Sequence, residues 1–119
     1  MAFTIINQSR ELSRAERAAL FVNHSQSIKD CDGQTLIVTA VCEYEKENAS
    51  GDAVHLMGFL LDDGTAVTTS SPTVMRSFNE IVDSLGIDTA EENIPLRVIS
   101  GVTKSGRTYF DVEYDSTLG

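Results

Sequence analysis

One amphipathic helix, with β-rich segments on both sides of it, limits the folds that this chain can adopt. This helix is predicted in SSPTVMRSFNEIVDSLG, residues 70–86, where Ser71 is a favourable N-cap, Pro72 suits the first turn and Gly86 ends the pattern. Apolar residues recur along it at helical spacing, namely Val74, Phe78, Ile81, Val82 and Leu85. We therefore expect one face of the helix to pack on a core.

The segments around this helix have the β-branched composition of strands. GQTLIVTAVCEYEK (33–46) predicts one strand, and AVHLMGFLLDDGTAVTTSS (53–71) predicts two strands joined at Asp63-Gly64. After the helix, LRVISGVTKSGRTYFDVEY (96–114) predicts a hairpin that turns at Ser105-Gly106. Three strands, a helix and two strands follow the order of the five-stranded OB-fold barrel, although other small barrels with one helix share it.

The N-terminal segment predicts an additional helix. SRELSRAERAALFVNH (9–24) has a capping box at 13–16 before its apolar residues. We expect one globular domain, in which a helical extension (1–25) packs on an OB-fold barrel (26–119). The spacing of Arg10, Arg14 and Arg17 places them on one face of this helix. This face is either simply exposed to solvent, or it contacts a polyanion, or it serves self-association.

Charge is distributed unevenly along this acidic chain. Nine Lys and Arg stand against 18 Asp and Glu among 119 residues, a net charge of −9. Residues 31–95 carry two cations and twelve anions, whereas residues 96–110 hold Arg97, Lys104 and Arg107 with no acid. The overall charge argues against unspecific attraction to polyanions, but the basic window permits local binding.

Neither an enzyme nor a membrane protein is indicated. The cysteines Cys31 and Cys42 form no CxxC motif or Cys/His cluster, the histidines His24 and His55 are isolated, and phosphate-loop and nucleophile motifs are absent. We expect both cysteines to be small buried residues and no metal or cofactor to be bound. Without a secretory signal or a long apolar run, the chain is expected to be cytoplasmic and to have no membrane partner.

Binding of single strands requires cations for the phosphates and exposed rings on which bases stack. In the last predicted strand, alternation places Arg107 and Tyr109 on the outer face and Phe110 and Val112 in the core, with Lys104 in the loop. The earlier strands add aromatic and basic candidates, of which Phe59 is equally compatible with the core. The candidate nucleic-acid-binding residues are Tyr44, Lys46, His55, Phe59, Arg97, Lys104, Arg107 and Tyr109.

Four segments in their order and spacing resemble the small single-stranded-DNA-binding proteins of protein-primed tailed bacteriophages. They are DGQTLIVTAV, DDGTAVTTSS, SPTVMRSFNEIV and KSGRTYFDVEY, and the resemblance covers residues 26–114. It implies an OB-fold viral protein that coats and protects displaced strands during DNA replication, with single-stranded DNA and replication proteins as partners. Matching positions are the double serine, Ser70 and Ser71, and the hairpin residues Lys104, Gly106 and Arg107.

Two other functions fit the same barrel. The net charge of −9 and the few cations suit a protein-interaction or virion structural module that binds no nucleic acid. An OB-type module for structured RNA or an oligosaccharide is the other alternative. Weak self-association is compatible with each of these functions.

Overall fold

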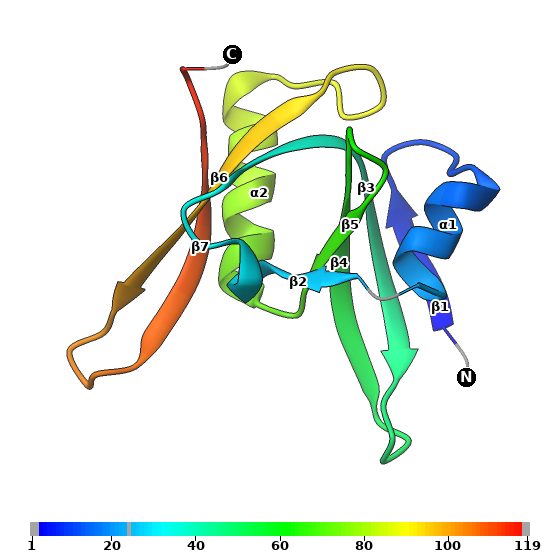
Figure 1. Cartoon of the computed structure of the whole chain (residues 1–119), viewed down its shortest axis with the longest axis horizontal. Helices are drawn as coiled ribbons and strands as arrows, with labels where there is room; N and C mark the ends of the chain where they lie inside the picture. The colour runs from blue at the N-terminus through cyan, green and yellow to red at the C-terminus, as the bar shows by residue number, and fades with distance from the viewer. Residues whose placement is uncertain (1–2, 24, 118–119) are drawn as a thin grey trace.

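The computed structural model describes residues 3–23 and 25–117, and it is mainly β with two α-helices (Figure 1). Residues 1–2 and His24 of the expected helical extension (1–25) lie outside the described residues. Residues 118–119 of the expected barrel (26–119) also lie outside them. The elements of the structure are β1 (Phe3–Gln8), α1 (Arg14–Phe21), β2 (Gln26–Ser27), the 3-10 helix η1 (Ile28–Cys31), β3 (Thr35–Glu47), β4 (Ala53–Leu61), β5 (Ala66–Thr69), α2 (Pro72–Leu85), β6 (Ile94–Val102) and β7 (Thr108–Tyr114).

The strands form one curled sheet that makes a half-barrel around α2 (Figure 1). Its order is β2-β5-β4-β3-β6-β7, and β1 pairs with β3 outside this path. The long strand β3 joins the two halves, because residues 35–38 pair with β6 and residues 38–47 pair with β4. A register shift between Val38 and Ala40 marks a bulge, which increases local twist and so helps the sheet to curl.

The predicted order of three strands, a helix and two strands is confirmed by β3, β4, β5, α2, β6 and β7. Both hairpins turn where they were expected, although in each turn the glycine alone has positive φ, at 86° for Gly64 and 83° for Gly106. The N-terminal segment differs from its prediction, since α1 covers only Arg14–Phe21 and the strand β1 precedes it. Pairing of β1 with β3 makes this segment part of the sheet.

One hydrophobic cluster fills the space between the sheet and α2. Phe78 of α2 meets Phe59 of β4 edge to face, with ring centroids 5.3 Å apart. The helix begins where the Ser71 hydroxyl accepts a hydrogen bond from the backbone N–H of Val74, and it ends at Gly86, whose φ is 63°. Both helix ends are therefore confirmed, and so is the apolar face from Val74 to Val82. Leu85 was predicted on this face but is 54% exposed, because it lies in the last turn of the helix, beyond the core.

A second cluster lies on the opposite face of the sheet, under α1. The capping box between Ser13 and Glu16 starts this helix as expected. Leu20 packs there with residues of β3 and β4, and Gly58 of β4 leaves the space that this leucine fills. Both cysteines are free and buried, Cys31 in the first cluster and Cys42 in the second, as their isolation in the sequence predicts.

Candidate functional site

A surface groove lies where β5 leads into α2, beside η1 and the start of β7, and its volume is about 270 Å³. Six of its lining residues are serines or threonines: Ser27, Thr69, Ser70, Ser71, Thr73 and Thr108. The others are Ile28, Lys29, Tyr109 and Phe110. We call this set the hydroxyl groove. None of its lining residues is an acid, although the protein carries a net charge of −9.

The N-terminus of α2 opens into the hydroxyl groove and favours an anion there. Backbone N–H groups at a helix start lack partners within the helix, and the helix dipole makes this end positive. Ser71 caps one of these groups through Val74, and the backbone N–H of Ser71 donates to the Thr69 hydroxyl at 3.0 Å. Neither bond uses the hydroxyls of Ser70 or Thr73, which remain available as donors to a bound phosphate.

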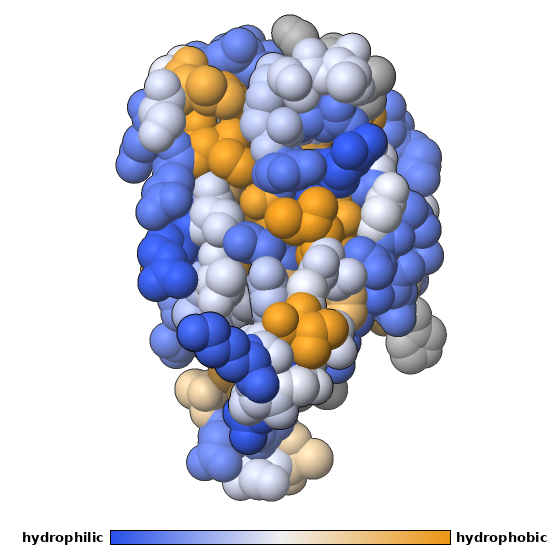
Figure 2. Space-filling view, turned by 90° about the vertical axis from the view of Figure 1, so that its left-hand side faces the viewer, coloured by the Kyte–Doolittle hydropathy of each residue, from blue (hydrophilic) through white to orange (hydrophobic). Residues whose placement is uncertain are grey.

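The β6–β7 hairpin brings an exposed ring and two cations to this region. Tyr109 is 45% exposed and lies across Gly101, its pairing partner on β6, so closely that a Cβ there would meet the tyrosine Oη at 2.4 Å. Lys104 and Arg107 are exposed in the adjoining turn, where the Arg107 backbone N–H donates to the Thr103 hydroxyl. Figure 2 shows the mixture of apolar and hydrophilic surface on this side of the molecule.

Strand β7 has the alternation that was predicted for it. Phe110 and Val112 contact the core cluster, whereas Arg107 and Tyr109 are exposed. This pattern follows from the pleat of a strand with one covered face. The structure thus keeps Lys104, Arg107 and Tyr109 together on one hairpin, next to the hydroxyl groove.

The prediction that Phe59 and Tyr44 stack on bases is wrong, because both rings are buried and neither can reach a base. Phe59 is 0% exposed and belongs to the core beside Phe78. Tyr44 is 3% exposed, because α1 covers the face of β3 on which it lies, and its ring contacts Phe21 at a centroid distance of 5.1 Å. Burial raises the pKa of Tyr44 to about 12.

The other three candidates lie apart from the hydroxyl groove. His55 points its Nε2 at the carboxylate of Glu43, 2.8 Å away, in a setting that does not favour phosphate. Lys46 is on the other hairpin, β3–β4, where it pairs with Phe3 of β1. Arg97 lies on β6 opposite Glu113, on the part of the strand that is distant from the turn.

Arg97 lies near one of the protein's own carboxylates, that of Asp115. The carboxylate of Asp115 accepts hydrogen bonds from the hydroxyls of Thr117 and Thr35, and these, with the nearby Arg97 charge, lower its pKa. The Thr35 bond is 2.6 Å long and joins the beginning of β3 to the residue that follows β7. Arg97 itself is exposed, and its separation from the hairpin turn is what sets it apart from Lys104 and Arg107.

The serines, threonines and Lys29 of the hydroxyl groove were not among the binding residues predicted from the sequence. Lys29 comes from η1 and Thr108 from β7, and only the folded chain brings these residues to one groove. The local signal that could have found part of it is the SSPT sequence, since a serine N-cap followed by proline marks a helix start that can bind anions.

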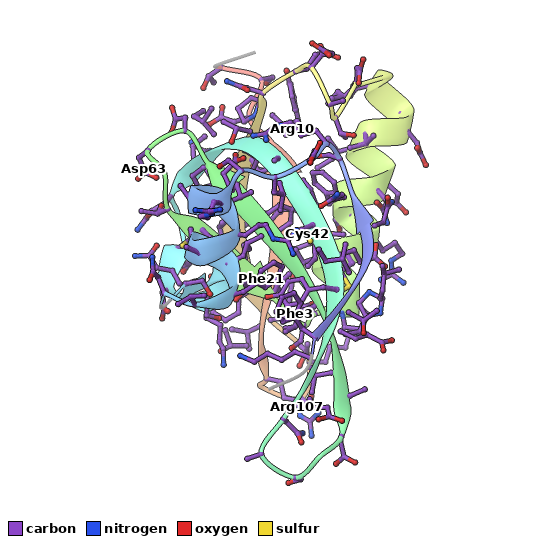
Figure 3. The ribbon with its side chains drawn as sticks, turned by 90° about the vertical axis from the view of Figure 1, so that its right-hand side faces the viewer. Phe3, Arg10, Phe21, Cys42, Asp63 and Arg107 are labelled. Atoms are coloured by element: carbon purple, nitrogen blue, oxygen red, sulfur yellow. The ribbon has the colours of Figure 1, made fainter. Side chains whose placement is uncertain are left out.

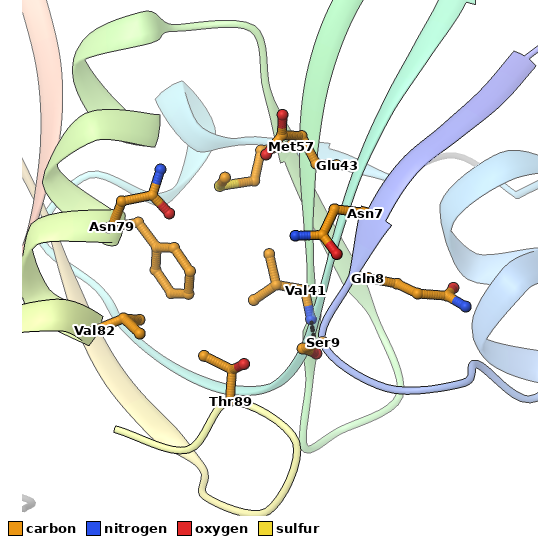
Figure 4. A pocket seen from close by; sticks show the side chains of 10 residues that line it. Asn7, Gln8, Ser9, Val41, Glu43, Met57, Asn79, Val82 and Thr89 are labelled. Atoms are coloured by element: carbon orange, nitrogen blue, oxygen red, sulfur yellow. Dashed lines mark hydrogen bonds between the residues drawn. The ribbon is translucent and has the colours of Figure 1, made fainter. Parts of the chain in front are cut away.

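Another cavity, of about 190 Å³, lies between β1, β3 and α2 (Figure 4). It is lined by amides such as Asn7 and Asn79, but also by the carboxylate of Glu43, which makes it less suited to an anion. At its edge the backbone N–H of Val41 donates to the Ser9 hydroxyl at 2.9 Å. The buried Oε1 of Gln8 has no hydrogen-bond partner among the described residues, and this side chain points away from the cavity (Figure 4).

Among residues 3–23 and 25–117, no three His, Cys, Asp or Glu side chains gather in a way that could hold a metal ion. Within the same part of the chain, neither α-helix has the length and apolar character needed to cross a membrane.

Comparisons of the chain with models of protein families, with curated proteins and with solved structures find no match.

Proposed function

We propose that this protein is an OB-fold protein that binds single-stranded DNA without sequence preference, by base stacking and by contacts to phosphates. The observation that carries the proposal is the hydroxyl groove, a site free of acids on an acidic protein, next to a hairpin with Tyr109, Arg107 and Lys104. Hydroxyl groups, cations and an exposed ring suit the binding of a ligand that carries phosphates and bases.

Strand pairing supports the OB-fold part of this proposal. If the five predicted strands are numbered along the chain, the sheet order β5-β4-β3-β6-β7 becomes 3-2-1-4-5, with the helix between the third and the fourth. OB-folds are partly open barrels that bind oligonucleotides through the face of strands 2 and 3 and through the loops 1-2 and 4-5. In this chain α1 covers part of that face, which leaves the β6–β7 loop and the adjacent hydroxyl groove accessible.

The groove and the hairpin supply the two kinds of contact that a single strand needs. Hydroxyls, the start of α2 and Lys29 suit phosphate oxygens, which are the same for every sequence. The exposed ring of Tyr109 suits base stacking, which contributes about 1–3 kcal/mol per base and tolerates any base. Both kinds of contact are independent of sequence, as coating of displaced strands during phage DNA replication requires.

Titration with oligo(dT) tests the proposal through tyrosine fluorescence, because the chain has no tryptophan. Tyr44 is buried and Tyr114 packs against the core cluster, so quenching should come mainly from Tyr109. Tyr109→Leu should weaken binding by about 1–3 kcal/mol, the contribution of one stacked base. Arg107→Gln should make the dependence of log K on log salt shallower by about 0.7, the value for one phosphate contact on a single strand.

Arg76→Gln is the matched control, since this exposed arginine does not line the hydroxyl groove. It lies on α2 with Glu80 and Asp83, in a cavity that meets the groove at Ser70. The substitution removes the same charge and should leave the salt dependence unchanged. Absence of any binding at low salt would refute the proposed function. A salt-resistant assembly with no response to oligonucleotide would favour the protein-interaction or virion module, and preference for a duplex or a sugar would favour the other OB-type alternative.

A further inference from the structure

An aromatic stack is exposed on the side of the molecule that carries α1 and β1 (Figure 3). The rings of Phe3 and Phe21 are nearly parallel, with centroids 4.2 Å apart and an interplanar angle of 19°. Phe21 also contacts the edge of Tyr44, which is buried, whereas Phe3 is 40% exposed. The stack therefore begins in the core and ends at the surface.

Two arginines flank this stack. Arg14 and Arg17, three residues apart on α1, line a cavity of about 420 Å³ together with Phe3 and Phe21. The guanidinium carbon of Arg17 is 5.9 Å from the centroid of the Phe21 ring. No acidic residue lines this cavity. Planar rings and cations therefore lie side by side in it.

These arginines are not used in ion pairs within the described part of the chain. Glu16 is the only acid of α1, and it is engaged by Arg10, whose Nη2 lies 2.6 Å from its Oε2, and by the backbone N–H of Ser13. Arg14 and Arg17 thus keep their charge for a ligand. Lys46, which pairs with Phe3 across β1 and β3, adds a third cation nearby.

We propose that this surface is a second contact for single-stranded DNA, in which a base stacks on Phe3 and the flanking phosphates lie against Arg14 and Arg17. The choice of ligand rests on the proposed function. A nucleic acid fits better than an apolar protein segment, because cations beside a stacked ring match the alternation of phosphates and bases. Figure 1 places α1 and β1 on one side of the molecule and the β6–β7 hairpin on the other, so a bound strand would extend across the protein.

The test uses the full chain and an oligo(dT) of about 16 nucleotides, the upper end of the site sizes seen for one OB unit. Because the chain has no tryptophan, Phe3→Trp introduces a single reporter at the end of the stack, and its emission should be quenched on binding. Leu85→Trp is the matched reporter, exposed near the end of α2, and its emission should not respond.

Two variants measure what the contact contributes. Phe3→Leu keeps an apolar side chain but removes the ring, and it should weaken binding about tenfold, within the range for one stacked base. Arg14→Gln combined with Arg17→Gln should make the salt dependence shallower by about 1.4, the value for two phosphate contacts. Arg76→Gln again controls for the loss of a charge, and circular dichroism of each variant checks that the fold is kept.

The outcomes separate this inference from the proposed function. If the wild-type chain binds no oligo(dT), the proposed function fails and the inference falls with it. If the wild type binds but the tryptophan at position 3 is silent, or the double arginine variant has an unchanged salt dependence, the inference alone is overturned. The same holds if Phe3→Leu abolishes self-association in sedimentation yet leaves DNA affinity intact, since the stack then serves a second copy of the chain.

Discussion

Gly58→Ala tests how α1 is held on the sheet. Gly58 lies on β4 under α1, and a Cβ at this position would lie 2.3 Å from Cδ2 of Leu20 and 3.5 Å from Cε1 of Tyr44. Carbon atoms in contact are normally about 3.5–4.0 Å apart, so the leucine would have to move by about 1 Å or more. Leu20 is 5% exposed and packed in the cluster under α1, which leaves it little freedom to do so.

We expect Gly58→Ala to lower the free energy of unfolding by about 1–3 kcal/mol, the usual cost of overpacking a core. At about 4 °C per kcal/mol for a domain of this size, the Tm should fall by about 4–12 °C. Urea unfolding followed by circular dichroism measures this directly, and the m-value should not change, because the surface exposed on unfolding stays the same.

Gly101→Ala is the matched control for this experiment. A Cβ there would also meet a side chain at short distance, the Oη of Tyr109 at 2.4 Å, but this tyrosine is exposed and can rotate away. Gly101→Ala should therefore lower the free energy of unfolding much less than Gly58→Ala does.

A double-mutant cycle with Leu20→Ala identifies the colliding partner. Leu20→Ala alone should cost about 2–5 kcal/mol, because it leaves a cavity. In the Gly58→Ala background it should cost at least about 0.5 kcal/mol less, because the alanine methyl occupies part of that space. Strictly additive costs, or a Gly58→Ala protein as stable as the wild type, would refute the packing of α1 against β4.

Two predictions concern pH. Burial raises the pKa of Tyr44 to about 12, above the ordinary value of 10. The contribution of Tyr44 to stability is therefore complete below about pH 10 and is lost as the pH rises toward 12. In an alkaline absorbance titration, one of the three tyrosines should ionise last, together with unfolding. The hydrogen bond from Arg10 lowers the pKa of Glu16 from 4.5 to about 2, so this pair stabilises the fold above about pH 4.5 and the effect fades as the pH falls toward 2. Glu16→Gln should lower the free energy of unfolding by less than about 1 kcal/mol at pH 7. The difference in urea midpoint between this variant and the wild type should shrink between pH 5 and pH 3. A difference that does not vary with pH would contradict the stabilising role of the pair.

The strand order and the helix could be predicted because their signals are local. Ser71, Pro72 and Gly86 act on backbone groups within a few positions, and the glycines at 64 and 106 mark the two hairpins. The strand β1 was missed, because its residues 3–8 show no alternation that separates a strand from an extended arm.

The exposure of the candidate binding residues could be predicted for β7 but not for β3 and β4, for a physical reason. Alternation along β7 placed Arg107 and Tyr109 correctly on the exposed face, because only one face of that strand is covered. The strands β3 and β4 are covered on both faces near their middle, by α2 on one side and α1 on the other, so alternation could not show that Tyr44 and Phe59 are both buried.

The amino-acid sequence alone predicts where α2 begins and ends, where the hairpins turn and which face of the last strand is polar, because each of these depends on interactions between residues close along the chain. Which rings stay accessible, and which distant residues share a site, depends on how the folded chain packs. The hydroxyl groove joins Lys29, Ser70 and Thr108, and the aromatic stack joins Phe3 to Phe21, through packing that brings separate segments together. Such contacts follow from the curl of the sheet and the docking of α1, which no local pattern encodes.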